Sequence, residues 1–204
     1  MSTVLVVCAH PDDEAVGCGG TLRRHALDGE EIVAVFLTSG EGGGHGEADH
    51  GETRRREARR AAAILGIAQL QFWEEPDGRL QARRSLATRL AELIDSLRPA
   101  LVYAPQPDDD HPDHRAAAKL VRRAVAASTA RPAVRFFEIW SPLADMDEIV
   151  DISDVIAEKR RAIRAYRSQC AVMRLDEAFV GLARYRGEMH SWPGGAYAEV
   201  FRSG

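Results

Sequence analysis

The chain has 204 residues, of which 45% are hydrophobic and 28% are charged, a composition typical of one soluble domain with a sizeable core. Its formal net charge of -4 provides no positive field to hold nucleic acid or an anionic membrane, so we expect no partner of either kind. Residues 1–204 are predicted to form a single α/β domain.

Cys8, Cys18 and Cys170 are an odd number of cysteines without C-x-x-C spacing, and Cys8 lies inside an apolar run. We expect them to be reduced thiols in a reducing compartment. The N-terminal residues do not have the pattern of a secretory leader, and no apolar run reaches the ~20 residues that cross a bilayer. The sequence therefore predicts a cytoplasmic protein. No oligomeric state is predicted.

The first apolar run, residues 4–9, ends abruptly at His10, Pro11, Asp12 and Asp13. A continuous apolar run without polar alternation is typical of a parallel strand that helices cover on both faces. Either aspartate can cap the helix that follows, but capping does not account for both of them together with the histidine. Because ligands bind beyond the carboxyl ends of strands in open α/β sheets, this segment indicates a site.

Residues 15–27 are predicted to form a helix, and residues 32–38 a second buried strand. The glycines within residues 17–20 are expected to pack the helix closely against a strand. They do not have the G-x-G-x-x-G spacing of a dinucleotide fingerprint. The glycine-rich segment 40–51 is predicted to be either a substrate loop or a simple surface loop.

The helix predicted over residues 52–65 carries several arginines, most of which should form a solvated face. Arg54 is the exception that we single out, because it lies near the amino end of the helix and could hold a polar group of the substrate. Glu57, three residues further on, is the candidate to orient it. A strand over 69–73 and a scaffold helix over 84–97 follow.

A fourth buried strand, residues 100–105, is followed by a second polar segment. The helix after it is predicted to span 112–127, because proline favours the first helical turn. This places His111 at the cap and both Asp113 and His114 in the first turn. Two strands of one predicted sheet thus end in histidine, proline and aspartate.

The remaining predicted elements are a strand over 134–140, a short extended segment over 149–152 and a helix over 155–168; the last thirty residues have no assignment. Strands that alternate with helices predict a three-layer Rossmann-like α/β sandwich with a mostly parallel sheet. The first and fourth strands are neighbours in the commonest doubly wound order. The two polar segments are therefore expected to meet.

Two histidines and one carboxylate form a common protein ligand set for catalytic zinc, with a fourth position left to water. His10, Asp13 and His114 supply such a set. The metal would polarise a carbonyl and activate a water molecule, so hydrolysis at neutral pH becomes feasible. Asp12 would be the general base.

His111 and Asp113 form a second pair, in which a carboxylate would hold an imidazole that stabilises an oxyanion and protonates a leaving amine. Spacing leaves alternatives open. His111 and His114 could both bind the metal, and Asp12 could replace Asp13 as a ligand. Another divalent ion such as Fe²⁺ could occupy the place of zinc.

These segments resemble the PIG-L/LmbE-like superfamily of zinc-dependent de-N-acetylases, whose members remove acetyl groups from N-acetylglucosaminyl conjugates and related amino sugars. The two main motifs are A-H-P-D-D-E at 9–14 and H-P-D-H at 111–114. The match extends to Arg54-x-x-Glu57, to residues 159–169 and to Glu199-x-Phe201. The chain departs from the family at Tyr166, where members often carry a histidine.

The resemblance implies zinc ligands His10, Asp13 and His114, the general base Asp12, an intermediate-stabilising His111 oriented by Asp113, and substrate contact by Arg54. It implies a small amino-sugar substrate. One alternative is a metal-dependent amidase that acts on a thiol or another non-acetyl conjugate. Another is a non-catalytic sugar-binding module, which would require loss of metal or acid–base residues, and none of them is missing from the sequence.

Overall fold

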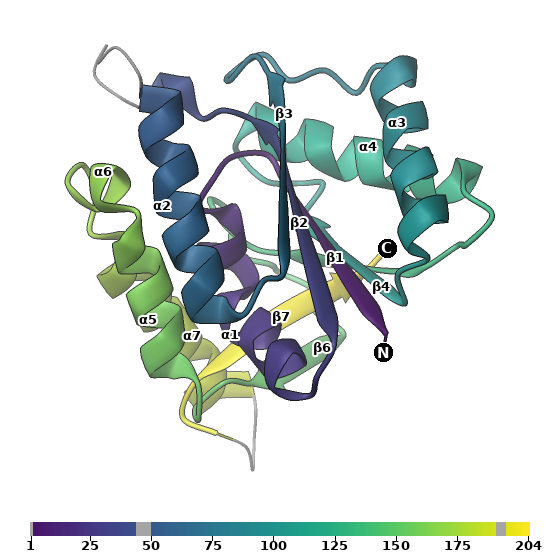
Figure 1. The fold of residues 1–204 in the computed structure, drawn as a ribbon. Coiled ribbons are helices and arrows are strands. Elements are labelled where there is room, and N and C mark those ends of the chain that lie inside the picture. Colours follow the sequence, from purple (N-terminus) through teal and green to yellow (C-terminus); the bar gives the residue numbers. More distant parts are fainter. Residues whose placement is uncertain (1, 44–49, 191–194) are drawn as a thin grey trace.

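A seven-stranded sheet lies at the centre of the computed structural model, which describes residues 2–43, 50–190 and 195–204 (Figure 1). The strands run in the order β3-β2-β1-β4-β5-β7-β6. Neighbours from β3 to β5 pair in parallel, whereas β7 is antiparallel to β5 and β6. The predicted Rossmann-like sandwich with a mostly parallel sheet is confirmed.

The strands are β1 (Thr3–Cys8), β2 (Glu31–Thr38), β3 (Gln69–Glu75), β4 (Leu101–Pro105), β5 (Ala133–Phe137), β6 (Glu148–Asp151) and β7 (Ala198–Ser203). The α-helices are α1 (Asp13–Leu27), α2 (His50–Leu65), α3 (Arg84–Leu97), α4 (Pro112–Ala127), α5 (Ile156–Ala165), α6 (Arg167–Cys170) and α7 (Leu175–His190). A 3₁₀ turn, η1, covers Glu41–Gly43. Among the described residues, no helix combines the length and the apolar character needed to cross a bilayer.

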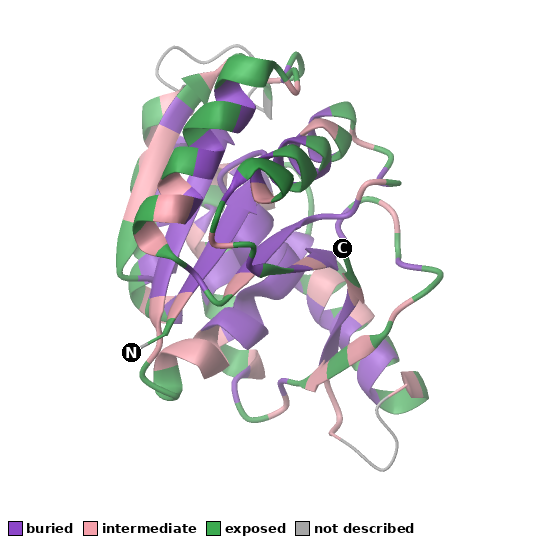
Figure 2. Ribbon diagram, turned by 90° about the vertical axis from the view of Figure 1, so that its right-hand side faces the viewer, coloured by how far each residue is buried: buried purple, intermediate pink, exposed green. Residues whose placement is uncertain are grey.

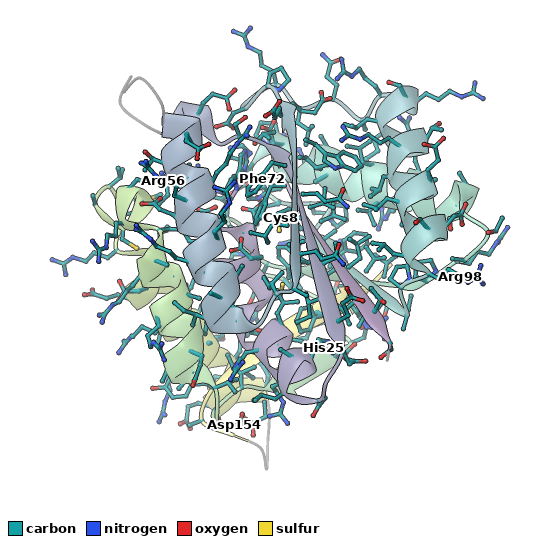
Figure 3. The ribbon with its side chains drawn as sticks, viewed as in Figure 1. Cys8, His25, Arg56, Phe72, Arg98 and Asp154 are labelled. Carbon is teal, nitrogen blue, oxygen red and sulfur yellow. The ribbon has the colours of Figure 1, made fainter. Side chains whose placement is uncertain are left out.

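The sheet separates two hydrophobic layers. The side chains of β1 contribute alternately to the two layers, because successive residues of a strand point to opposite faces of the sheet. Val4, Val6 and Cys8 pack with α1, α2 and α5, whereas Leu5 and Val7 pack with α3 and α4 (Figures 1 and 2). Figure 3 shows the Cys8 side chain in the interior and Arg98 at the surface. Burial on both faces is the reason that β1 has no polar alternation.

The parallel register between β1 and β4 positions the two polar segments. Val4, Leu5 and Val6 lie opposite Leu101, Val102 and Tyr103. The carboxyl ends of the two strands therefore meet at one edge of the sheet, followed by the starts of α1 and α4. This confirms that the first and fourth strands are neighbours.

A kink divides α1, and a distant carboxylate satisfies the backbone that the kink frees. Cys18 has non-helical angles (φ -140°, ψ 20°), so a new helical segment begins after it. Glu199 on β7 accepts the N–H groups of Gly20 at 2.9 Å and Thr21 at 2.7 Å. Lys159 of α5 donates to the same carboxylate at 2.6 Å and is buried. Glu199 thus caps a helix from outside that helix.

Two expectations differ from the structure in the second half of the chain. The predicted helix over 155–168 is divided at Tyr166, whose angles (φ -81°, ψ 66°) end α5 before α6 begins. The strand predicted over 134–140 ends at Phe137. The segment without assignment contains α7 and β7. Residues 44–49 of the glycine-rich segment and residues 191–194 lie outside the described residues.

We predict that Gly17→Ala destabilises the protein by about 1–3 kcal/mol, because over-packing a core displaces its side chains. A Cβ at Gly17 would lie 2.3 Å from Cδ2 of Phe137. The control is Gly181→Ala on the exposed face of α7, where a Cβ would meet no atom within 4 Å. It should stabilise by about 0.5–1 kcal/mol through helix propensity. Urea unfolding of both variants measures the difference. A Gly17→Ala protein as stable as the wild type would contradict the packing account.

Candidate active site

The turn between β1 and α1 fixes two neighbouring carboxylates. Asp12 has φ 126°, a backbone conformation that residues other than glycine rarely adopt. Its N–H donates to Oε2 of Glu14 at 3.2 Å, and Oδ2 of Asp13 accepts the N–H of His10 at 2.9 Å. The turn is therefore held by carboxylates that follow it in the chain, in place of a side-chain cap from Asp12.

Arg54 orients the Asp12 carboxylate. Its Nη2 lies 2.9 Å from Oδ2 of Asp12 and donates to the carbonyl of Pro11, while Nη1 donates to the carbonyl of Gly40 at 3.1 Å. Gly40 has φ +67°, and a Cβ there would lie 2.6 Å from Nη1. Burial raises the pKa of Asp12 to about 6 against the opposing effect of Arg54. Asp12 is therefore ionised at neutral pH and can accept a proton.

Glu57 does not take the part that helical spacing suggested. Its carboxylate accepts the backbone N–H of Ser168 at 2.9 Å and the hydroxyl of Ser168 at 2.6 Å. Glu57 thus ties α2 to α6, and the expectation that it orients Arg54 is replaced by the contact with Asp12. Arg54 still borders the cavity described below, so substrate contact by Arg54 stays a prediction.

Two carboxylates hold one nitrogen of His10. Nε2 lies 2.9 Å from Oδ1 of Asp77 and 3.2 Å from Oδ2 of Asp113. Burial lowers the pKa of His10, but hydrogen bonds to Asp113, Asp13 and Asp77 outweigh burial and raise it well above its ordinary value. The other nitrogen, Nδ1, lies 3.9 Å from Oδ1 of Asp13. The contacts of Nε2 with Asp77 and Asp113 thus orient the His10 ring so that Nδ1 faces Asp13.

His114 repeats this arrangement with a different partner. Its Nδ1 lies 3.0 Å from Oδ1 of Asp109, and its buried Nε2 has no hydrogen-bond partner among the described residues. Nε2 lies 3.3 Å from Oδ1 of Asp13. Burial lowers the pKa of His114, but Asp13 and Asp109 together raise it to about 9. A buried imidazole nitrogen 3.3 Å from a carboxylate oxygen is a donor pair suited to a metal ion.

His111 lies between these two histidines at the start of α4. Its ring centroid is 4.7 Å from that of His10 and 4.8 Å from that of His114. Nδ1 accepts the backbone N–H of Asp113 at 3.2 Å, so His111 is the N-cap of α4. Burial and the two neighbouring histidines lower its pKa. The ring is therefore neutral, and its proton is on Nε2.

The predicted contact of the Asp113 carboxylate with the His111 ring is not the one that the structure shows: the backbone N–H of Asp113 donates to His111, and the Asp113 carboxylate lies elsewhere. It contacts His10 and accepts the N–H groups of Gly78 at 2.7 Å and Leu80 at 3.0 Å. The reason is geometric. A residue two positions after an N-cap presents its N–H to the cap side chain, which leaves its own side chain free to point toward the neighbouring loop.

Sequence reasoning did not assign roles to Asp77 and Asp109. Asp77 lies in the turn after β3, and besides His10 it accepts the N–H of Gly42 at 2.8 Å. Asp109 lies after β4 and also accepts the N–H of Trp140 at 3.0 Å. Both follow strands at the same edge of the sheet as His10. Their position at this edge was the available signal, and turn chemistry explained them equally well.

A cavity of about 410 Å³ opens onto this group of residues. Its lining includes the predicted site residues His10, Asp12, Asp13, Arg54 and His111. His114 and Asp113 are buried beside it, in contact with Asp13 and His10 respectively. The structure thus brings all seven predicted residues together around one cavity.

Glu14 forms a buried support beneath this turn. Its Oε1 accepts the hydroxyl of Tyr166 at 2.5 Å, and its Oε2 accepts the N–H of Asp12. Both Glu14 and Tyr166 are fully buried. Burial raises the pKa of Glu14 to about 8, although the hydrogen bond from Tyr166 lowers it. The tyrosine at which the chain departs from the superfamily pattern therefore supports the turn through Glu14.

A Rossmann-like sandwich whose adjacent strands β1 and β4 both end in histidine and aspartate places the chain among α/β enzymes with a site at the switch point of the sheet. A family model described as PIG-L: GlcNAc-PI de-N-acetylase matches residues 5–125. The chain belongs to this family.

The similarity to known proteins extends over nearly the whole chain. The diacetylchitobiose deacetylase of Thermococcus kodakarensis is 32% identical to this chain over an alignment of 225 positions, gaps included. The alignment covers 98% of this chain and 82% of that protein. The crystal structure of the conserved protein TT1542 from Thermus thermophilus has a TM-score of 0.88 and 35% identity, and covers 100% of this chain and 94% of that chain.

A third similar protein has a different name. The structure of GalB, the 4-carboxy-2-hydroxymuconate hydratase of Pseudomonas putida, has a TM-score of 0.86 and 27% identity. It covers 100% of this chain and 96% of that chain. The fold thus occurs in proteins named for two reactions.

We predict that Glu14→Gln gains stability relative to the wild type as pH rises. The folded-state pKa of about 8 lies above the ordinary 4.5, so folded Glu14 binds a proton that the unfolded chain releases. Stability from this group therefore falls as pH rises from 4.5 to 8, and glutamine lacks this dependence. The gain between pH 5 and pH 8 should exceed about 1.4 kcal/mol, the equivalent of one pKa unit.

Urea unfolding of chelator-treated protein at the two pH values measures this gain. Glu177→Gln is the matched control, because it changes an exposed carboxylate on α7. The same pH dependence in the wild type and in Glu14→Gln would show that Glu14 does not carry the proton.

Proposed function

We propose that the chain is a metal-dependent hydrolase that removes the N-acetyl group from an N-acetylglucosamine-type amino sugar or its small-molecule conjugate. One observation carries the proposal: Asp12, a carboxylate held by Arg54, borders the same cavity as Asp13, which lies 3.3 Å from the buried Nε2 of His114. Membership of the de-N-acetylase family and the similarity to a diacetylchitobiose deacetylase support the choice of bond and of sugar.

We assign His10, Asp13 and His114 as the residues that would hold the metal, with zinc as the proposed ion. Zinc ligands at about 2.0–2.2 Å in tetrahedral geometry lie about 3.3–3.6 Å apart. The Asp13 oxygen is 3.3 Å from Nε2 of His114, which matches this spacing, and 3.9 Å from Nδ1 of His10, which is slightly longer than this spacing. A bound zinc ion would polarise the substrate carbonyl and lower the pKa of water toward ~7.

A second set of donors lies nearby. One nitrogen from each of His10, His111 and His114 forms a group whose members lie within 4.8 Å of one another. We prefer Asp13 to His111 as the third ligand, because Nδ1 of His111 already accepts the N–H of Asp113. The charge of Asp13 also favours a cation, and its pKa lies well below the ordinary value because the histidines outweigh its burial.

Asp12 is assigned as the general base. Its carboxylate is ionised at neutral pH, and Arg54 fixes its Oδ2, so the group is oriented to remove a proton from the attacking water. The protonated Asp12 can then donate this proton to the departing nitrogen. One carboxyl group thereby serves both halves of the hydrolysis.

His111 is assigned as the donor to the developing oxyanion. Because Nδ1 accepts the N–H of Asp113, the protonated nitrogen is Nε2. A fixed N–H donor that faces developing negative charge needs no rearrangement during the reaction. A neutral ring is a hydrogen-bond donor rather than a proton source, so the proton for the leaving amine is assigned to Asp12.

Hydration is the second candidate reaction, because a hydratase shares 27% identity and the whole length of the fold. In both reactions an activated water molecule attacks a substrate that contains a carbonyl group. Asp12 as the base and His111 as the hydrogen-bond donor would therefore keep their roles. The products distinguish them. Hydrolysis of an acetamido sugar releases acetate and a free amine, amidase action on a thiol or another conjugate releases a different acid, and hydration releases neither.

We predict that Asp12→Asn lowers kcat for release of acetate from N-acetylglucosamine conjugates by about 10²–10⁴-fold, the usual contribution of a general base. Metal content should match that of the wild type, because Asp12 is assigned as a base and not as a ligand. Asp108→Asn is the matched control, since Asp108 is an exposed carboxylate paired with Arg202. Equal turnover in Asp12→Asn and wild type would eliminate Asp12 as the base.

We also predict that Asp109→Asn weakens metal binding by about 10- to 100-fold, because the partner of a ligating histidine fixes its orientation and basicity. Competition with a chelator, followed by metal analysis, measures the affinity. Asp108→Asn, adjacent in sequence but exposed, should bind metal as the wild type does.

The same measurement on two further variants separates the two donor sets. His111→Gln should retain metal, whereas Asp13→Asn should lose it. The opposite result would replace the proposed ligands by the three histidines.

A further inference from the structure

Part of the lining of this cavity is apolar, and we refer to it as the apolar wall. Val16 of α1, Ile139 and Trp140 after β5, Val172 and Met173 after α6, and Phe179 of α7 form it. None of them is needed for the chemistry assigned above. The wall therefore needs an explanation of its own.

Exposure of apolar side chains is concentrated at this cavity. Seven large apolar residues in the described part of the chain are strongly exposed, and three of them, Trp140, Val172 and Met173, border the cavity. Their exposed fractions are 52%, 49% and 38%. Exposed apolar side chains that line one cavity mark a binding site more often than scattered single residues do.

Hydrogen bonds of the backbone fix the segments that carry these side chains. The N–H groups of Val172 and Met173 both donate to the carbonyl of Gln169 at 3.0 Å, and the N–H of Leu175 donates to the carbonyl of Met173 at 2.8 Å. The N–H of Trp140 donates to Asp109, which also holds His114. The apolar wall is thus built into ordered turns and connected to the polar side.

All the residues of the apolar wall except Val16 lie in a part of the chain that the family model does not match. That model covers residues 5–125, which include every predicted site residue, whereas the wall residues from Ile139 to Phe179 follow it. Residues that perform the reaction and residues that would select the substrate are therefore separate in sequence, although they share one cavity.

We infer that the substrate carries an apolar group, alkyl or aryl, that packs against Trp140, Val172 and Met173 while its N-acyl amide group faces Asp12 and His111. This inference rests on the proposed function, because it extends the same site. A fully polar disaccharide would leave the wall in contact with water. The apolar group can be attached at the glycosidic oxygen or can extend the acyl chain, and the same contact chemistry serves both.

The test compares matched substrates on the metal-loaded protein. Methyl and hexyl glycosides of N-acetylglucosamine form one pair, and the N-acetyl and N-hexanoyl forms of the methyl glucosaminide form the other. Burial of one methylene is equivalent to about fourfold in affinity. We expect kcat/KM to be at least tenfold higher for the hexyl or the hexanoyl compound, and the pair that shows the preference identifies the point of attachment.

Variants connect this preference to the wall. Met173→Ser and, separately, Val172→Ser should lower the ratio of kcat/KM between the apolar compound and its short counterpart by threefold or more. Met189→Ser is the matched control, because Met189 is 62% exposed on α7 and does not line the cavity. It should leave the ratio unchanged. A ratio near one in the wild type for both pairs would overturn the inference.

Calorimetric binding to Asp12→Asn separates the two proposals. Tighter binding of a hexyl or hexanoyl compound without turnover by the wild type would refute the proposed function and support the apolar subsite. Turnover of every acetamido compound with equal affinities within each pair would support the proposed function and refute the subsite.

Discussion

Parallel pairing of β1 with β4 is the constraint on which the site depends. His10, Asp12 and Asp13 follow one strand, and His111 and His114 follow the other, about a hundred residues later in the sequence. Only the adjacency of the two strands brings these segments together, and burial of both faces of β1 fixes its register. A shift of register by one residue would move every β1 side chain to the opposite layer.

Charge balance is the second requirement of this edge of the sheet. Two imidazoles and one guanidinium face the carboxylates of Asp12, Asp13, Asp77, Asp109 and Asp113. The raised pKa values of His10 and His114 favour their protonated forms. The positive charges of the two protonated rings offset part of the negative charge of the carboxylates. A divalent ion held by both histidines would supply the same charge in place of those protons, so metal binding and proton release are coupled.

The sequence was most informative where the apolar pattern was continuous or periodic. The strands β1, β2 and β4 and the helices α3 and α4 were predicted within one residue at each end, because the patterns of buried strands and amphipathic helices are distinct. α5 was predicted to continue through Tyr166, because propensity does not reveal that a buried hydroxyl contacts Glu14. α7 received no assignment, since charged residues interrupt its apolar positions.

The site residues, too, were predicted only in part from the sequence. Residues at strand ends were found because position and chemistry agree there. The contacts that orient them were not found. Asp109 lies only five positions before His114, but it is in the loop before α4, where helical spacing does not apply. The contacts of Asp77 with His10 and of Arg54 with Asp12 join segments far apart in the sequence, and spacing along one helix does not encode such pairings. The role proposed for Glu57 was wrong for this reason.

The capping of α1 by Glu199 affects how the protein acquires its structure during synthesis. Glu199 lies 179 positions after Gly20, and Lys159, which neutralises it, also lies far downstream. A ribosome would therefore have translated β7 before the kinked helix α1 could receive its cap. Until then the N–H groups of Gly20 and Thr21 lack their native acceptor, so completion of α1, which begins at the proposed site, should be among the last events of folding.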